Sequence, residues 1–317
     1  MKFFIHFFLL VFILFFIVPG IIFAQNEEFY NQVLLFGTDA DIAKAFTNME
    51  VDLGADINKK VLMLFHEEHS LAVHTALVRY MAAIRMSEAE EVLIEELNNG
   101  SPDEDYREDL IHALGKLKKT SSLPFLRNYY FNNKSTIRIK KAIIDAWGEI
   151  GDVSIEDALV RIVTDVHEDS EVKGRAIIAL GKVKSVSSLD LLERIARNRF
   201  ENKYLRMYAV YSLGEVGGES VLGILGELLR DESHEVAEYA VKSISIIASE
   251  KSGIYLIGAL RSDYDKVRYY AAIGLGELQY GDAADILAFK AEYDTNEIVR
   301  REAQKALEQI QKKNDKE

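Results

Sequence analysis

A short motif, Leu-Gly or a close substitute, returns about every 33 residues through most of this 317-residue chain. Its six copies are Leu114-Gly115, Trp147-Gly148, Leu180-Gly181, Leu213-Gly214, Ile244-Ser245 and Leu275-Gly276. Successive copies are separated by 33, 33, 33, 31 and 31 residues. A fixed period of this size is typical of a solenoid, in which each repeat is a small unit that stacks on its neighbours.

Apolar residues occupy fixed positions around each motif. A Leu follows the Gly position by eleven residues in every copy: Leu126, Leu159, Leu192, Leu225, Leu256 and Leu287. A Leu, Ile or Ala precedes it by five residues: Leu110, Ile143, Ala176, Ala209, Ala240 and Ala271. This spacing predicts two helices per repeat, here named the motif helix, which ends near the Gly, and the second helix, which starts about seven residues after it.

The borders of the motif helices also carry sequence signals. Good capping residues precede them: Ser70, Asp103, Asp169, Asn202, Ser233 and Asp263. We expect the Gly near the helix end to adopt left-handed backbone angles. The repeats span residues 70–311, after a degenerate N-terminal capping region over 25–69 with looser helices at 27–36, 39–50 and 55–66. The last helix, 297–311, precedes a polar tail at 312–317 that we expect to be disordered.

The segment from Val267 to Leu278, VRYYAAIGLGEL, resembles a HEAT repeat of the short bacterial subclass that also occurs in phycobilisome lyases. The resemblance covers about residues 70–311. It implies an all-α, right-handed α-solenoid, a HEAT/armadillo-like superhelix of stacked antiparallel helix pairs, usually with a protein-binding role. In HEAT solenoids the second helix of a pair usually lines the concave side, so we expect the same arrangement here.

An apolar segment at the N-terminus indicates the compartment. Residues 3–24 carry no charge, follow Lys2, and end with Ala24 after a Pro19-Gly20 break. This pattern favours a signal peptide over residues 1–24, and therefore export to the bacterial periplasm or cell envelope. The alternative is an uncleaved membrane anchor, because about 20 apolar residues can span a bilayer. The chain has no cysteine, which excludes a lipid-modified Cys after the segment as well as disulfides.

The overall charge argues against nucleic acid as a partner. Lys and Arg total 38 against 51 Asp and Glu, a formal charge of −13. A strongly acidic chain is repelled by phosphate backbones and anionic lipids. We therefore expect a protein partner, with membrane contact only through the N-terminal segment.

Arginines recur off the apolar face of the second helices. They are Arg127, Arg161, Arg194, Arg197, Arg230 and Arg261, and apolar Ile257 and Phe289 occupy neighbouring positions. These eight residues form the candidate partner-binding set. Because a guanidinium binds carboxylates in a bidentate manner, we expect the partner to be acidic. The alternative is a solvated face on which the arginines pair with Glu193, Glu227 and Asp190.

A second basic series lies eight residues before each motif Gly. Its members are His74, Arg107, Lys140, Lys173, Arg206, Arg268 and Arg300. In this repeat family the position tends to bridge adjacent repeats through backbone carbonyls or acidic loops. Asp103, Asp105, Asp169, Glu171 and Asp265 are available as partners, so we assign the series to stability.

Catalytic signatures are not found in the sequence. His66 and His69 lack the spacing of zinc proteases, and the positions six and seven residues before each Gly hold no His-Glu pair of the kind that HEAT-repeat di-iron hydroxylases use. We expect no catalytic, cofactor or metal site. The leading hypothesis is an exported, non-enzymatic HEAT scaffold that binds another protein. The alternatives are a membrane-anchored structural spacer and a repeat-built lyase or accessory enzyme.

Overall fold

The computed structural model describes residues 27–101, 103–132 and 135–314, and it contains two compact units, one up to Ile150 and one from Gly151 onward. Throughout the described residues the regular secondary structure is helical. The apolar segment over residues 3–24 lies outside them, so signal peptide and anchor both stay predictions. None of the described helices combines the length and the apolar character that crossing a bilayer requires.

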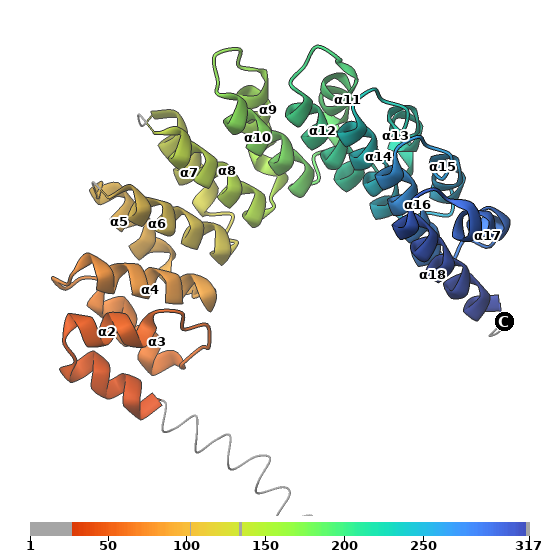
Figure 1. Ribbon diagram of the computed structural model, residues 1–317. Helices are drawn as coiled ribbons and strands as arrows, with labels where there is room; N and C mark the ends of the chain where they lie inside the picture. Colours follow the sequence, from red (N-terminus) through yellow and green to blue (C-terminus); the bar gives the residue numbers. More distant parts are fainter. Residues whose placement is uncertain (1–26, 102, 133–134, 315–317) are drawn as a thin grey trace, which may run out of the picture. The chain divides into compact units, whose positions relative to one another are not determined.

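Unit 1 begins with a helix over residues 27–36 and continues with short helices α2 and α3 before the repeats start (Figure 1). The helices are α2 (Asp39–Phe46), α3 (Ala55–Leu64), α4 (Leu71–Ala83), α5 (Glu90–Asn99), α6 (Glu104–Leu117), α7 (Ser122–Asn132) and α8 (Ile137–Ile150). Motif helices α4, α6 and α8 lie side by side. The three looser helices expected before residue 67 are therefore present, although α2 ends four residues earlier than predicted.

Unit 2 contains five helix pairs with the predicted alternation. The second helices are α9 (Glu156–Thr164), α11 (Leu189–Arg197), α13 (Leu222–Leu228), α15 (Ser252–Ala259) and α17 (Ala284–Tyr293). The motif helices are α10 (Ser170–Lys182), α12 (Lys203–Gly217), α14 (His234–Ile247), α16 (Asp265–Glu277) and α18 (Glu297–Asn314). These stacked pairs form the expected HEAT-like α-solenoid fold. Helix α18 runs three residues past 311, into the predicted tail.

Small residues set the distance between motif helices. A Cβ on Gly115 would lie 2.8 Å from the Cα of Ala146, and one on Gly214 would lie 2.5 Å from the Cβ of Ser243 on the next motif helix. At this short distance, side chains also reach the neighbouring backbone, since the buried Ser243 hydroxyl donates to the carbonyl of Val210 at 3.0 Å. The layer of motif helices is thus closely packed.

We expected the motif glycines to end their helices in the left-handed conformation, and the structure shows that they do not. Gly115, Gly181 and Gly276 lie within α-helices, and it is the residue three positions later that adopts positive φ. These residues are Lys118, Lys184 and Gln279, with φ of 55°, 54° and 49°. The expectation was wrong because these glycines, which lack a Cβ, allow neighbouring helices to pack closely. The turn that reverses the chain direction begins three residues later.

The second helices are spread further apart than the motif helices. In unit 2, neighbouring motif helices pack along their length, whereas neighbouring second helices approach at only a few points. When the helices of one layer lie closer together than those of the other, the stack curves and the closely packed layer lies on the inner side. Figure 1 accordingly shows α11, α13, α15 and α17 on the outer side of this unit. The expected concave position of the second helices is therefore wrong for unit 2, because the Ala, Gly and Ser positions lie on the motif helices.

The predicted helix caps are largely in place. The side chains of Asp103, Asp169, Asn202 and Ser233 accept hydrogen bonds from the first-turn backbone of α6, α10, α12 and α14. Ser70 is the N-cap residue of α4 without a side-chain bond. The exception is α16, whose N-cap is Tyr264 and not Asp263.

Candidate functional site

A groove of about 890 Å³ opens between second helices α13 and α15. Its lining includes Ile254, Tyr255 and Tyr264 together with two arginines of the predicted set, Arg230 and Arg261. Both arginines occupy the turn directly after their helix, 31 residues apart, so they are equivalent positions of successive repeats. The spread of the second helices thus creates a surface depression that carries a repeated positive charge.

Glycines leave room in this groove. Gly223 and Gly226 of α13 and Gly258 of α15 line it. A Cβ on Gly223 or on Gly258 would meet nothing within 4 Å, whereas one on Gly226 would collide with the ring of Tyr255. The space beside Gly223 and Gly258 is therefore open to a ligand, and Tyr255 fills the space beside Gly226.

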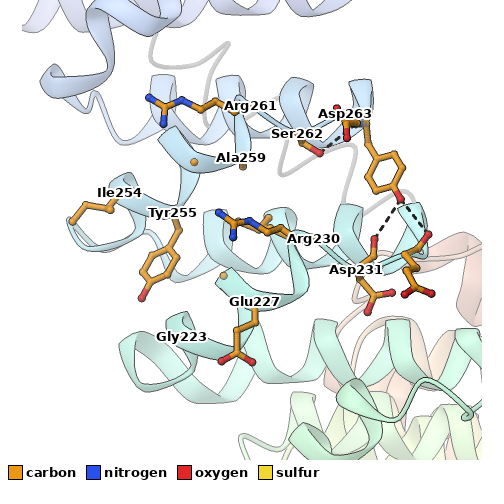
Figure 2. Close-up of a pocket in the computed structure, with 15 residues that line it drawn as sticks. Gly223, Glu227, Arg230, Asp231, Ile254, Tyr255, Ala259, Arg261, Ser262 and Asp263 are labelled. Carbon is orange, nitrogen blue, oxygen red and sulfur yellow. Dashed lines mark hydrogen bonds between the residues drawn. The ribbon is translucent and has the colours of Figure 1, made fainter.

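Two acids of the groove lie away from its two arginines. Figure 2 shows the guanidinium groups of Arg230 and Arg261 extending toward the end that holds Ile254 and Tyr255, with Asp231 and Asp263 at the opposite end. Both arginines are exposed, and among the described residues neither has an ion pair or a side-chain hydrogen bond. Two guanidinium groups in the groove are therefore available to an external carboxylate.

Most acids that line the groove already have a cationic partner. Glu227 pairs with Arg197 at 3.1 Å and Glu232 with Arg199 at 2.6 Å. Asp231 is bound by the buried Arg206. Only Asp263 is without a cation among the described residues that line the groove, and it lies at the end opposite the two arginines.

Tyr264 fixes the far end of the groove. Its hydroxyl donates to the backbone carbonyls of Asp231 at 3.4 Å and Glu232 at 3.1 Å. These bonds connect the start of α16 with the loop before α14, as the dashed lines in Figure 2 show. The groove therefore has a defined wall, and the ring of Tyr264 belongs to it.

The remaining candidate residues are distributed over several second helices. Arg127 lies exposed on α7 and Arg161 on α9, Arg194 lines a smaller cavity beside α11, and Arg197 pairs with Glu227 as the solvated-face alternative proposed. Ile257 is half-buried on α15, and the side chain of Phe289 on α17 is 57% exposed. The groove brings together only Arg230 and Arg261 of the eight.

The second basic series contains ion pairs that join adjacent repeats. Buried Arg206 of α12 donates to the carbonyl of Ala196 at 3.0 Å and to Asp231 at 3.2 Å, in the loop before α14. Buried Arg268 of α16 binds Asp294, before α18, through two bonds of 2.8 Å. We name each Arg–Asp pair a clasp. For these two positions the predicted contacts are present, but the acids differ from the five we named and lie 25 or 26 residues further along the chain.

The clasp changes the acidity of its carboxylate. Burial alone would raise the pKa of Asp294, but hydrogen bonds from Arg268, from the backbone N–H of Asn296 and from Lys290 hold it at about 2. The guanidinium of Arg268 has a raised pKa, chiefly because it donates to Asp294. The pair is therefore fully charged at neutral pH.

The histidine segment forms local contacts. The Nδ1 atom of His69 lies 2.8 Å from a carboxylate oxygen of Asp39, and the same carboxylate accepts from the backbone of Ser70. These bonds hold the pKa of Asp39 near 2. Within the described ranges no group of three or more potential metal ligands gathers.

Sequence reasoning missed several residues of the groove. Tyr255, Tyr264 and the glycines Gly223 and Gly258 were not singled out, although they line it. Two glycines within the seven residues of α13 were the available signal, because glycine is unfavourable in a helix unless space is needed.

Comparison with known families supports the repeat assignment. The family model described as HEAT repeats matches residues 131–202 and 199–268, and the model described as PBS lyase HEAT-like repeat matches residues 267–289. Together they run from 131 to 289, which is 159 of the 317 residues. No curated protein matches the sequence.

Several solved structures are similar to this chain at low identity. An engineered protein shares 20% identity over 87% of this chain and 82% of its own, with a TM-score of 0.42. The CpcE–CpcF complex of phycocyanin lyase from Nostoc sp. PCC7120 shares 14% over 80% and 94%, with a TM-score of 0.46. Human deoxyhypusine hydroxylase in complex with glycerol shares 15% over 91% and 98%, with a TM-score of 0.36. With TM-scores below 0.5, these similarities support no functional argument.

The assignment therefore depends on the repeat period, the helix pairs that follow it and the two matching family models. The chain is a HEAT-repeat protein.

Proposed function

We propose that this HEAT-repeat protein is a non-enzymatic scaffold that holds an acidic, partly apolar segment of a partner protein in the groove between α13 and α15. HEAT repeats suggest a protein-interaction role in general. The observation that carries the proposal is the pair Arg230 and Arg261 beside Ile254 and Tyr255, two arginines that have no ion pair among the described residues. Guanidinium groups bind carboxylates and the apolar side chains supply contact area, a combination common at protein interfaces.

The test uses a labelled peptide that alternates Glu with Leu and Tyr, followed by fluorescence anisotropy. Charge-assisted hydrogen bonds contribute roughly 1.5 to 3 kcal/mol each, so the double variant R230E/R261E should bind at least about tenfold more weakly. The matched control is R85E/R301E, which reverses two exposed arginines outside the groove. Equal affinity of R230E/R261E and the wild type would refute the groove as the binding site.

A second variant tests the space instead of the charge. Gly258→Leu adds a side chain whose Cβ meets no atom within 4 Å, and it replaces a glycine in a helix by a better helix former. We expect unchanged or higher stability together with weaker peptide binding. Retained binding by a folded Gly258→Leu variant would show that the peptide lies elsewhere.

We also propose that the chain is exported, with residues 1–24 removed on the way. The support is the uncharged run over residues 3–24 after Lys2, with Ala24 before the expected cut. Mass spectrometry of the protein from its natural source should find an N-terminus at Gln25. A chain that retains residues 1–24 in the membrane fraction would instead support the anchored spacer.

A further inference from the structure

The clasp joins the same kinds of partner in two repeats of unit 2, although the carbonyl acceptors lie ten and six residues before their arginines. In the first, Arg206 contacts the carbonyl of Ala196, near the end of α11, and Asp231, in the loop before α14. In the second, Arg268 contacts the carbonyl of Ser262 at 2.9 Å and both carboxylate oxygens of Asp294. Each clasp thus satisfies a buried cation with one carbonyl and one carboxylate.

The preceding repeat lacks the carboxylate. Thirty-three residues before Arg206, Ala196 and Asp231 stand Lys173, Val163 and Asn198. The cation is therefore kept, but its acid is replaced by an amide. The side-chain oxygen of Asn198 accepts from the backbone N–H of Phe200 at 3.1 Å. Lys173 is half-buried, and in the described part of the chain it has no ion pair.

A cavity opens at this position. It has a volume of about 270 Å³ and is lined by Lys173, Val163 and Asn198, the three positions that correspond to the clasp. Arg194 of α11 adds a second positive charge to the lining, and it too is without an ion pair within the described residues. Thr164 and several apolar residues, among them Leu191 and Ile195, also line the cavity.

One acid is also present. Glu201 lines the cavity, and its carboxylate accepts from the backbone N–H of Asn202 at 3.0 Å. The lining therefore contains two cations and one anion. Among the described residues Glu201 forms no ion pair with either cation, and an external anion would lower the cost of the excess positive charge in this half-buried site.

We propose that this cavity binds a carboxylate, which takes the place that Asp231 and Asp294 fill in the following repeats. Lys173 and Arg194 donate to its oxygens. The cavity is small, so it admits one acidic side chain of a partner or a small free dicarboxylic acid. The site is separate from the groove between α13 and α15 and does not depend on the function proposed for that groove.

The test compares the wild type with N198D and K173M. Asp at position 198 supplies the missing acid from the chain itself and keeps the acceptor for the Phe200 N–H. We therefore expect N198D to be at least as stable as the wild type and to bind external carboxylate at least tenfold more weakly. K173M removes the cation and should lose binding to a similar extent, and thermal unfolding shows whether it is folded.

Sodium succinate and a capped Glu-Gly-Glu peptide are the probes, titrated by calorimetry at constant ionic strength. Saturable wild-type binding of either probe, lost in both variants, supports the site. Tighter binding of succinate indicates a free acid as the ligand, and tighter binding of the peptide indicates a side chain.

Three results would overturn the proposal: no saturable binding to the wild type, unchanged binding to N198D and K173M, or a clear preference for inorganic phosphate. The R230E/R261E variant should bind succinate normally. The experiments therefore distinguish a failure of the proposal for the groove from a failure of the proposal for this cavity.

Discussion

The two helix layers of unit 2 come from the same repeats, yet different contacts hold them. Motif helices α12, α14 and α16 are separated by Gly, Ala and Ser, and α12 and α16 carry the buried arginines of the two clasps. Second helices α11, α13 and α15 are short and touch one another little, and exposed arginines lie on α11 and in the turns after α13 and α15. We therefore expect stability to be concentrated in the inner layer, which leaves the outer layer free to carry binding residues.

The largest expected effect is the loss of a clasp. Arg268→Ala leaves Asp294 as a buried charge without its main partner, which should lower the free energy of unfolding by about 3 to 5 kcal/mol. Arg261→Ala in the outer layer removes an exposed side chain and should change it by less than about 0.5 kcal/mol. Urea unfolding followed by circular dichroism measures both. Similar losses in the two variants would contradict the view that the inner layer contributes more to stability than the outer layer.

Glycine-to-alanine replacements compare how tightly the inner and the outer layer are packed. Gly214→Ala brings a Cβ to 2.5 Å from that of Ser243 and should cost about 2 to 3 kcal/mol, because two packed backbones must separate. Gly223→Ala in α13 meets no atom within 4 Å and should be neutral or stabilising by up to about 1 kcal/mol. Chemical unfolding of both variants measures the two changes in the free energy of unfolding. A harmless Gly214→Ala would show that the inner layer can expand.

Acid should weaken the inner layer through Asp294. Its pKa is about 2 in the folded chain against an ordinary value of 3.8. A depressed folded-state pKa contributes stability above pH 4 that disappears as the pH falls from about 4 to 2, here about 2 kcal/mol. Unfolding measured across this range should show a smaller slope in D294N, which has already lost the clasp. An identical slope in both chains would contradict this role of Asp294.

The smallest effect concerns the turn after the motif helix. Gln279 adopts φ of 49°, a conformation that glycine accepts more easily. Gln279→Gly should therefore leave the stability unchanged or raise it by up to about 1 kcal/mol, since the gain is offset by the greater freedom of glycine in the unfolded chain. Thermal unfolding provides the measurement. A marked loss would mean that the Gln279 side chain contributes contacts of its own.

Much of the fold follows from sequence period. The recurring Leu and Ala positions predict both helices of each repeat, and the residue types of Asp103, Asn202 and Ser233 predict the caps that they form. Periodicity shows which residues face a core. It does not show how closely two helices approach, and that distance decides which layer is inner and where the glycines act.

The candidate site was predictable only in part. Arg230 and Arg261 were singled out from their repeat position, and the structure places both in one groove. The groove itself depends on the spread of α13 and α15, which no local pattern reports. Likewise, Asp231 and Asp294 lie 25 and 26 residues after their arginines, so the clasps became visible only in three dimensions.

The reach of each clasp has a consequence for how such a chain can lengthen. Arg206 lies in one repeat and Asp231 in the segment that leads into the next. If the DNA for one such repeat were duplicated in frame, the inserted copy would bring an arginine for the aspartate downstream and an aspartate for the arginine upstream. Both new junctions would be encoded at once, so the molecule could grow by gene duplication without inventing a contact.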